Sequence, residues 1–135
     1  MARSPGSSGG RATHTEAARA QLLATEEARK ATQVSLVASV GTAWLNLVAD
    51  EELLALTRQT LSTRDESLRL VRLRFENGAS SELDLRQAES LAETARVSLA
   101  QLQRQRALDL NTLGLLLGEP LPTDFSAATS TAAVQ

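Results

Sequence analysis

The chain of 135 residues contains no cysteine and no tyrosine, and it has only two phenylalanines and one tryptophan. Without cysteine it has neither a disulfide framework nor a thiolate metal site. Aromatic residues make up 2% of the sequence, which is poor material for the core of a compact globular domain. The hydrophobic content of 42% comes mostly from leucine, alanine and valine, a composition typical of helices and coiled coils.

Charge and motifs exclude several function classes. The formal net charge is −2 with both signs interspersed, so we expect no nucleic-acid partner. The single histidine, His14, has no neighbour at a metal-binding spacing, and the chain lacks a glycine-rich phosphate loop and a Ser-His-Asp set. Catalysis needs convergent groups in a concave site, which a rod of two helices does not supply. We therefore expect no enzyme activity, no cofactor and no metal site.

The sequence also shows no targeting segment and no membrane-spanning segment. Residues 1–10 are rich in proline, glycine and serine and lack the apolar stretch of a signal peptide. The most apolar window, residues 34–49, is interrupted by polar residues and is shorter than the ~20 residues that a span needs. The sequence thus predicts no signal peptide, membrane strand or transmembrane helix in this chain.

What the chain has in abundance is helix-forming sequence. Residues 16–77 contain no proline and a single glycine, and alanine, leucine, glutamate, arginine and glutamine dominate them. They predict one helix of roughly 90 Å. A second helix is predicted from about residue 81 to 117, where Gly118 provides a C-terminal stop. We expect a disordered or displaced tail at residues 1–15 and a flexible tail at 123–135.

Apolar residues recur at every seventh position of the first helix, which predicts left-handed supercoiling against a neighbour. The companion positions are mixed, because charged residues follow Trp44; they are Glu51, Arg58, Asp65 and Arg72. In the second helix Arg106 and Asp109 interrupt an apolar stripe. The residues predicted to pack between helices are Val40, Trp44, Leu47, Leu54, Leu61, Leu68, Leu99 and Leu102.

A short turn joins the two predicted helices. Gly78 can end the first helix because glycine adopts the left-handed conformation without a Cβ penalty. Ser80 or Ser81 can cap the second helix, and Asp84 places negative charge at its positive end. A turn this short makes the helices antiparallel neighbours. The predicted fold is therefore all-α: a long antiparallel helical hairpin of coiled-coil type.

The first helix is longer than the second. Folding the chain about residue 79 leaves residues 16–40 without a helix opposite them. The apolar side chains in this stretch include Leu22, Leu23, Val34, Leu36 and Val37. Exposed apolar stripes mark interfaces, so the pattern indicates further helices from other subunits or from other parts of a longer chain.

Two motifs together resemble a known family. One lies at the turn and the other at the end of the second helix: Arg74-Phe75-x-x-Gly78-x-x-Ser81-x-Leu83-Asp84-Leu85-x-Gln87-Ala88-Glu89 and Asn111-x-Leu113-x-x-Leu116-Leu117-Gly118-x-Pro120-Leu121-Pro122. Their order and spacing resemble the TolC-like outer-membrane efflux proteins, the channel components of tripartite exporters. The ending is similar to the first of the family's two α-hairpin repeats. Residues 16–122 thus resemble one truncated repeat.

The resemblance implies a function. The hairpin would be one segment of a trimeric α-barrel in the periplasm, and the intact homotrimer would be a passive conduit for export of drugs or other small molecules. The implied partners are a periplasmic adaptor (membrane fusion) protein and, through it, an inner-membrane pump. The implied location is the outer membrane and periplasm. The alternative is a soluble, self-associating coiled-coil module without a role in transport.

The resemblance also implies site residues at the tip. Adaptor docking would involve Arg74, Phe75, Gly78, Ala79 and Ser81. The acidic residue Asp84 corresponds to a family position near the closed periplasmic mouth and is a candidate for gating the aperture. Local chemistry leaves plainer interpretations open. The tip can be an ordinary capped turn, with the Asp84 carboxylate favoured by the helix dipole and Arg74 a last-turn cation.

Overall fold

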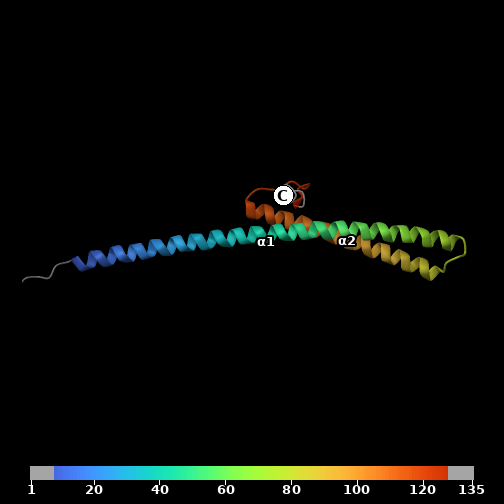
Figure 1. The fold of residues 1–135 in the computed structure, drawn as a ribbon, viewed down its shortest axis with the longest axis horizontal. Helices are drawn as coiled ribbons and strands as arrows, with labels where there is room; N and C mark the ends of the chain where they lie inside the picture. Colours follow the sequence, from blue (N-terminus) through green and yellow to red (C-terminus); the bar gives the residue numbers. More distant parts are fainter. Residues whose placement is uncertain (1–7, 128–135) are drawn as a thin grey trace, which may run out of the picture. The chain divides into compact units, whose positions relative to one another are not determined.

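The computed structural model describes residues 8–127 and contains two helices in that range, α1 (Ser8–Glu76) and α2 (Glu82–Leu117), with no strand there. The prediction of an all-α fold is confirmed (Figure 1). The chain divides after Ser39 into two units, residues 1–39 and 40–135.

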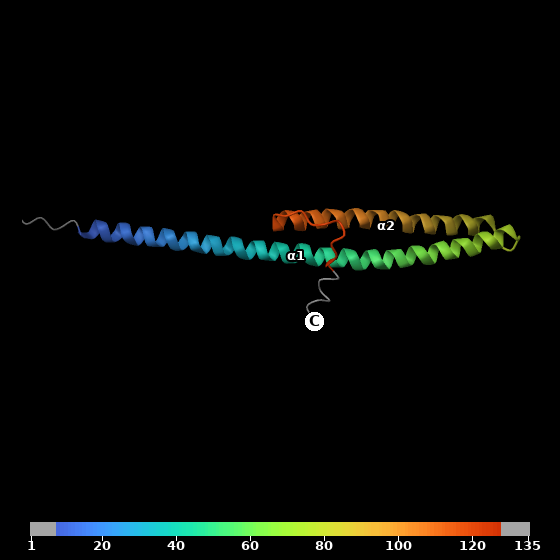
Figure 2. The ribbon, with the colours of Figure 1, turned by 90° about the horizontal axis from the view of Figure 1, so that it is seen from above.

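In the second unit, α2 runs back beside the second half of α1 as the predicted antiparallel hairpin (Figures 1 and 2). The pairing of residues shows the direction: Arg72 contacts Glu89 near the turn, and Glu51 contacts Arg106 far from it. α2 begins at Glu82 and ends at Leu117, where Gly118 takes a left-handed conformation with φ +77°. This glycine stops the helix at the position that the sequence predicts.

Apolar side chains between the two helices form two clusters. The cluster near the turn contains Leu68, Leu85 and Ala92. The cluster at the open end of the hairpin contains Ala43, Leu47, Leu110, Leu113 and Ala127. Leu47 and Leu113 are completely enclosed, and full burial of one such leucine stabilises a fold by about 1.5–3 kcal/mol. A single layer of apolar contacts thus holds the hairpin together.

The seven-residue stripe lies along this layer. Leu47, Leu54 and Leu68 are buried, whereas Phe75, the last member of the stripe, is exposed at the tip. The other residues predicted to pack are half-buried; they are Val40, Trp44, Leu61, Leu99 and Leu102.

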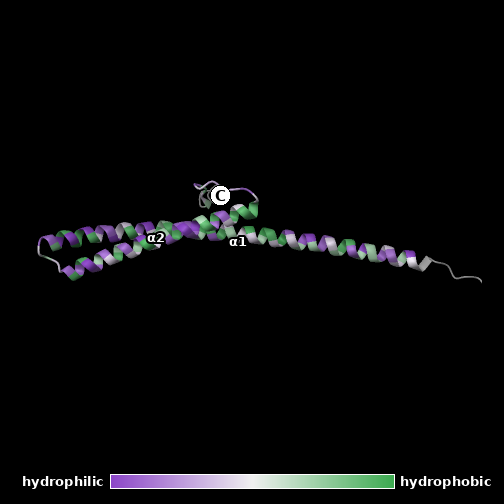
Figure 3. Cartoon of the chain, turned by 180° about the vertical axis from the view of Figure 1, so that it is seen from behind, coloured by the Kyte–Doolittle hydropathy of each residue, from purple (hydrophilic) through white to green (hydrophobic). Residues whose placement is uncertain are grey.

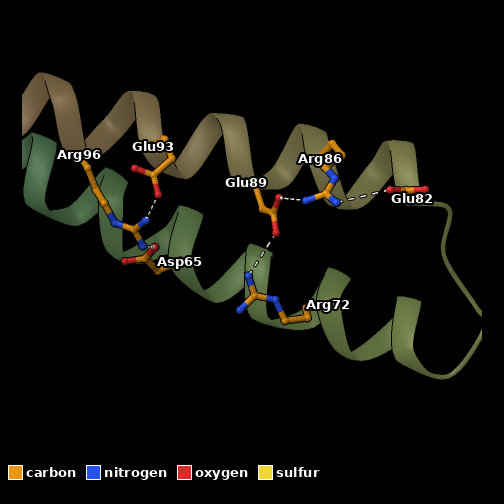
Figure 4. A network of polar contacts seen from close by, with 7 residues as sticks. All are labelled: Asp65, Arg72, Glu82, Arg86, Glu89, Glu93 and Arg96. Atoms are coloured by element: carbon orange, nitrogen blue, oxygen red, sulfur yellow. Dashed lines mark hydrogen bonds and ion pairs between the residues drawn. The ribbon is translucent and has the colours of Figure 1, made fainter.

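Three of the four charged companion positions of α1 pair with α2. Asp65 accepts from Arg96 at 2.6 Å, and Arg72 donates to Glu89 at 3.3 Å (Figure 4). Glu51 pairs in the same way with Arg106 at 3.0 Å. Within α2 the network continues, since Arg86 bonds Glu89 and Glu82, and Arg96 also bonds Glu93 (Figure 4). Arg86 in turn lowers the pKa of the Glu89 carboxyl. Polar pairs therefore occupy the seam that the apolar repeat leaves incomplete.

α1 begins at Ser8, earlier than the predicted start near Glu16. Threonine hydroxyls in this segment donate to backbone carbonyls one turn back, as Thr15 does to Arg11 at 2.9 Å. Adding residues to an existing helix needs no new nucleation. Weak helix formers such as residues 8–15 can therefore extend the strong helix that begins after them. Part of the predicted tail, residues 8–15, is therefore helical. Residues 1–7 of that tail lie outside the described part of the chain.

The predicted flexible tail also begins with a packed segment. Residues 123–127 contact the hairpin, where Phe125 packs against the open-end cluster and Ala127 is fully buried in it. Two apolar side chains and a set of polar contacts hold this segment, which the sequence assigned to a flexible tail. Residues 128–135 lie outside the described part.

The first unit exposes its whole described surface. Every side chain from residue 10 to 39 is exposed, and apolar and polar stretches alternate along it (Figure 3). By length and composition alone, the helix at Gly10–Glu76 contains one window apolar enough to cross a membrane, where the sequence predicted none. The core helix of a soluble protein or a signal sequence can be as long and as apolar as this helix.

Candidate functional site

The tip of the hairpin is built on a glycine turn. Gly78 has φ +71°, a left-handed conformation that costs other L-residues roughly 1–2 kcal/mol. The Ala79 amide donates to the Arg74 carbonyl oxygen at 2.7 Å, and the Asn77 side-chain amide donates to the Leu73 carbonyl oxygen at 2.7 Å. These bonds engage two of the carbonyl groups in the last turn of α1.

Ser81 caps α2. Its Oγ accepts from the Asp84 amide at 3.1 Å, and the Asp84 Oδ2 accepts from the Ser81 amide at 3.3 Å, which completes a reciprocal capping box. Ser80 does not cap the helix, but its hydroxyl donates to the same Asp84 oxygen at 3.3 Å. The choice that the sequence left open between the two serines thus falls on Ser81.

The Asp84 carboxylate belongs to this cap. Hydrogen bonds from Ser81 lower the pKa of Asp84, with smaller contributions from Ser80 and from the charge of Arg74. The carboxylate therefore stays ionised well into the acidic range and stabilises the start of α2. Its geometry fits the plainer interpretation of Asp84, a first-turn carboxylate, and the described residues offer it no bond beyond the tip itself.

The tip gathers the five predicted docking residues within one reversal of the chain. Arg74 and Phe75 stand on the last turn of α1, Gly78 and Ala79 form the turn, and Ser81 starts α2. An open cleft lies beside them, with Val71, Arg74, Ala79, Ser80, Asp84 and Gln87 among its lining residues. The large apolar side chains exposed around the tip are Leu73, Phe75 and Leu83.

A second polar group, at the open end of the hairpin, was not recognised as a site in the sequence. Arg106 and Asp109 of α2 face Asp50 and Glu51 of α1 there. The interruption of the apolar stripe by Arg106 and Asp109 was the available signal, but it does not name the partners. Burial and the neighbouring Asp109 raise the pKa of Asp50 to about 6, against the opposing effect of Arg106. The Asp50 Oδ2 is buried without a hydrogen-bond partner.

Among residues 10–127 no group of three or more histidine, cysteine, aspartate or glutamate side chains is arranged to hold a metal ion. Serine, glutamine and arginine side chains instead engage carboxylates at both ends of the hairpin, as the Gln105 amide does at Asp109 at 3.2 Å. The chemistry of the two polar groups is therefore that of caps and ion pairs.

Comparison with known proteins decides the family. The family model described as outer membrane efflux protein matches residues 7–119, which include the whole of both helices. The chain belongs to the outer membrane efflux protein family. This confirms the resemblance carried by the motifs at the turn and at the end of α2. The family is one of efflux channels and not of enzymes.

The similar proteins in this family include three from pseudomonads. The toluene efflux pump outer membrane protein TtgC and the antibiotic efflux pump outer membrane protein ArpC of Pseudomonas putida are each 45% identical over 112 residues. The outer membrane protein OprJ of Pseudomonas aeruginosa is 43% identical over 104 residues. These matches cover 83%, 83% and 77% of this chain. They cover only 23%, 23% and 22% of the relatives, so the chain spans less than a quarter of their length.

Proposed function

We propose that this chain provides one α-hairpin of the periplasmic barrel of an outer-membrane efflux channel. The observation that carries the proposal is the family match over residues 7–119, which coincides with the helices of the hairpin. In this function the hairpin is a passive wall element. Energy for export comes from an inner-membrane pump, and the hairpin itself carries out no energy-yielding reaction.

The proposed cargo is drugs or other small molecules. The names of the relatives support this class, since they assign those proteins to toluene and antibiotic efflux pumps. The proposed location is the outer membrane and periplasm, where the relatives are outer membrane proteins.

Assembly into a homotrimer is part of the proposal, and exposed leucines on the hairpin support it. One layer of side chains lies between α1 and α2, while other leucines point away from it; they include Leu45, Leu53, Leu56, Leu70, Leu91 and Leu108. A barrel wall needs lateral contacts on both sides of each hairpin, and side chains of this kind supply them.

Docking of a periplasmic adaptor is assigned to the tip in this proposal. The exposed ring of Phe75 and the cationic side chain of Arg74 flank a turn without a bulky side chain at Gly78 and Ala79. An adaptor helix can therefore approach the backbone closely at this turn. The cleft beside Val71 and Asp84 adds a recess for one of its side chains.

Gating of the aperture by Asp84 is a further part of the proposal. In the hairpin this carboxylate bonds Ser80 and Ser81. A gating role requires it to reach a neighbouring helix in the assembled channel, beside or in place of these bonds. Substitution by alanine would then alter the closed-state conductance as well as the cap.

The test uses the full-length channel protein that contains this hairpin. We expect Ala79→Glu to reduce export of a dye substrate from whole cells, because the new carboxylate occupies the docking surface without needing a positive φ. The control is Gln101→Glu, which adds the same charge at an exposed site of α2 away from the tip. Equal export by Ala79→Glu and Gln101→Glu, at equal outer-membrane levels, would contradict docking at the tip.

A further inference from the structure

The chain that follows α2 returns to α1. After Gly118, residues 121–127 pass from α2 back to α1 at the open end of the hairpin (Figure 2). We call residues 121–127 the strap. Its Phe125 ring packs edge-on against Trp44, with ring centroids 5.8 Å apart and an interplanar angle of 74°. Ala127 is fully buried in the cluster that contains Leu47.

The guanidinium of one α2 residue, Arg106, bonds both α1 and the strap. Arg106 of α2 donates from Nε and Nη2 to the Glu51 Oε1 of α1, at 3.3 and 3.0 Å. It also donates to two carbonyl oxygens of the strap, that of Phe125 and that of Thr123, the latter at 3.4 Å. The Ser126 hydroxyl completes the set by donating to the Glu51 Oε2 at 2.9 Å.

The Arg106–Glu51 pair differs from the other cross-helix pairs in burial. Its two side chains are 21% and 12% exposed, whereas those of Arg96 and Asp65 are 44% and 43% exposed. An exposed pair contributes little because solvent screens it. Removing the guanidinium of an enclosed pair leaves the carboxylate without its opposite charge and takes a donor from each carbonyl oxygen that the guanidinium bonded.

We propose that Arg106 holds the strap closed over the open end of the hairpin, and that loss of this contact releases the strap and exposes the apolar cluster around Trp44 and Leu47. The strap is a conformational device within the chain. The proposal does not depend on channel function, because every contact that carries it lies within residues 40–127.

The chain provides its own probe for this device, because Trp44 is its only tryptophan and touches the strap. The experiment measures acrylamide quenching of Trp44 fluorescence in the 135-residue chain and its variants, with helix content followed by circular dichroism. We expect Arg106→Gln to raise the quenching constant roughly twofold while helix content is kept, as local opening without global unfolding predicts. Glutamine is a good helix former at this position.

The matched control is Arg96→Gln, which removes the exposed cross-helix pair with Asp65 and leaves the strap contacts in place. It should leave Trp44 quenching unchanged. A second variant, Phe125→Ala, removes the apolar anchor of the strap by a substitution outside both helices, and it gives the quenching of Trp44 without the covering ring. An Arg106→Gln chain that is helical but quenched like the unsubstituted protein would overturn the proposal. Unchanged quenching in Phe125→Ala would also overturn the proposal. This second criterion applies even if Arg106→Gln unfolds the chain.

Discussion

Gly78 shows how a single residue determines the tip. Its φ of +71° is reached at low cost only by a residue without Cβ, and a Cβ built there meets no atom within 4 Å. The requirement for glycine is therefore one of backbone conformation and not of space. Ser81 and Asp84 make the opposite end of the turn equally specific, because their reciprocal bonds need both side chains.

A pair of glycine substitutions tests this interpretation. We expect Gly78→Ala to lower the free energy of unfolding by about 1–2 kcal/mol, the cost of a left-handed alanine. The control, Gly41→Ala, should raise it by about 1 kcal/mol, because Gly41 lies inside α1 with open space around it. Urea denaturation followed by circular dichroism measures both. Stabilisation by Gly78→Ala would show that the turn does not need a positive φ.

The pH dependence of stability should carry a contribution from Asp50. Its pKa is about 6 in the folded chain against an ordinary value of 3.8, so the folded state binds the proton more tightly. The stabilisation is therefore complete below about pH 4 and is lost as the pH rises through 6. The charged groups that face Asp50 from α2 are Asp109 and Arg106. We expect Asp50→Asn to raise the melting temperature at pH 7.5 and to flatten its change between pH 4.5 and 7.5 relative to the unsubstituted chain.

Asp50→Asn has a natural control in Asp84→Asn, since the pKa of Asp84 is lowered and its stabilising effect is lost only as the pH falls through the folded value. Asp84→Asn should therefore lower the melting temperature at pH 7.5. Identical melting curves for the Asp50→Asn and unsubstituted chains at both pH values would remove Asp50 from the account.

At the scale of elements, the contact between α1 and α2 has an apolar and a polar component with different effects. The stripe through Leu47, Leu54 and Leu68 supplies most of the burial. The cross-helix pair of Asp65 with Arg96 is half-exposed, and such a pair contributes at most about 1 kcal/mol. Its main effect is to fix which residues of the two helices stand opposite each other.

Leu47 lies on the buried face of α1 and Leu45, two residues before it, lies on the exposed face. We expect Leu47→Ala to lower the free energy of unfolding by about 2–5 kcal/mol, because it opens a cavity in the open-end cluster. Leu45→Ala should change it by less than about 0.5 kcal/mol, since Leu45 is 67% exposed. Chemical denaturation at low protein concentration measures both; a larger loss at Leu45 would show that the two faces are reversed.

The sequence predicted the local features and missed those that depend on distant partners. The turn at Gly78 was predictable because the glycine stop and the serine cap are local signals. The partner of Arg106 was not, since 55 residues separate it from Glu51 and only the register of the hairpin brings them together. The packed part of the strap was missed because Phe125 and Ala127 stand in an otherwise polar tail.

At the scale of the whole molecule, the hairpin leaves much apolar surface unused. Residues 10–39 are exposed throughout, and several leucines of the hairpin point away from its single contact layer. Such surface is costly in water and is normally covered by a partner. The chain spans less than a quarter of its relatives, which is consistent with a hairpin whose contacts belong to a larger assembly.

Docking at the tip is the central claim, and cross-linking in cells tests it most directly. A photoreactive amino acid would replace Phe75 in the full-length channel protein, with Gln101 as the control position, and mass spectrometry would identify the cross-linked partner. We predict that a periplasmic adaptor protein is recovered from position 75 and not from position 101. Recovery of an adaptor from neither position, with the protein present in the outer membrane, would contradict the account.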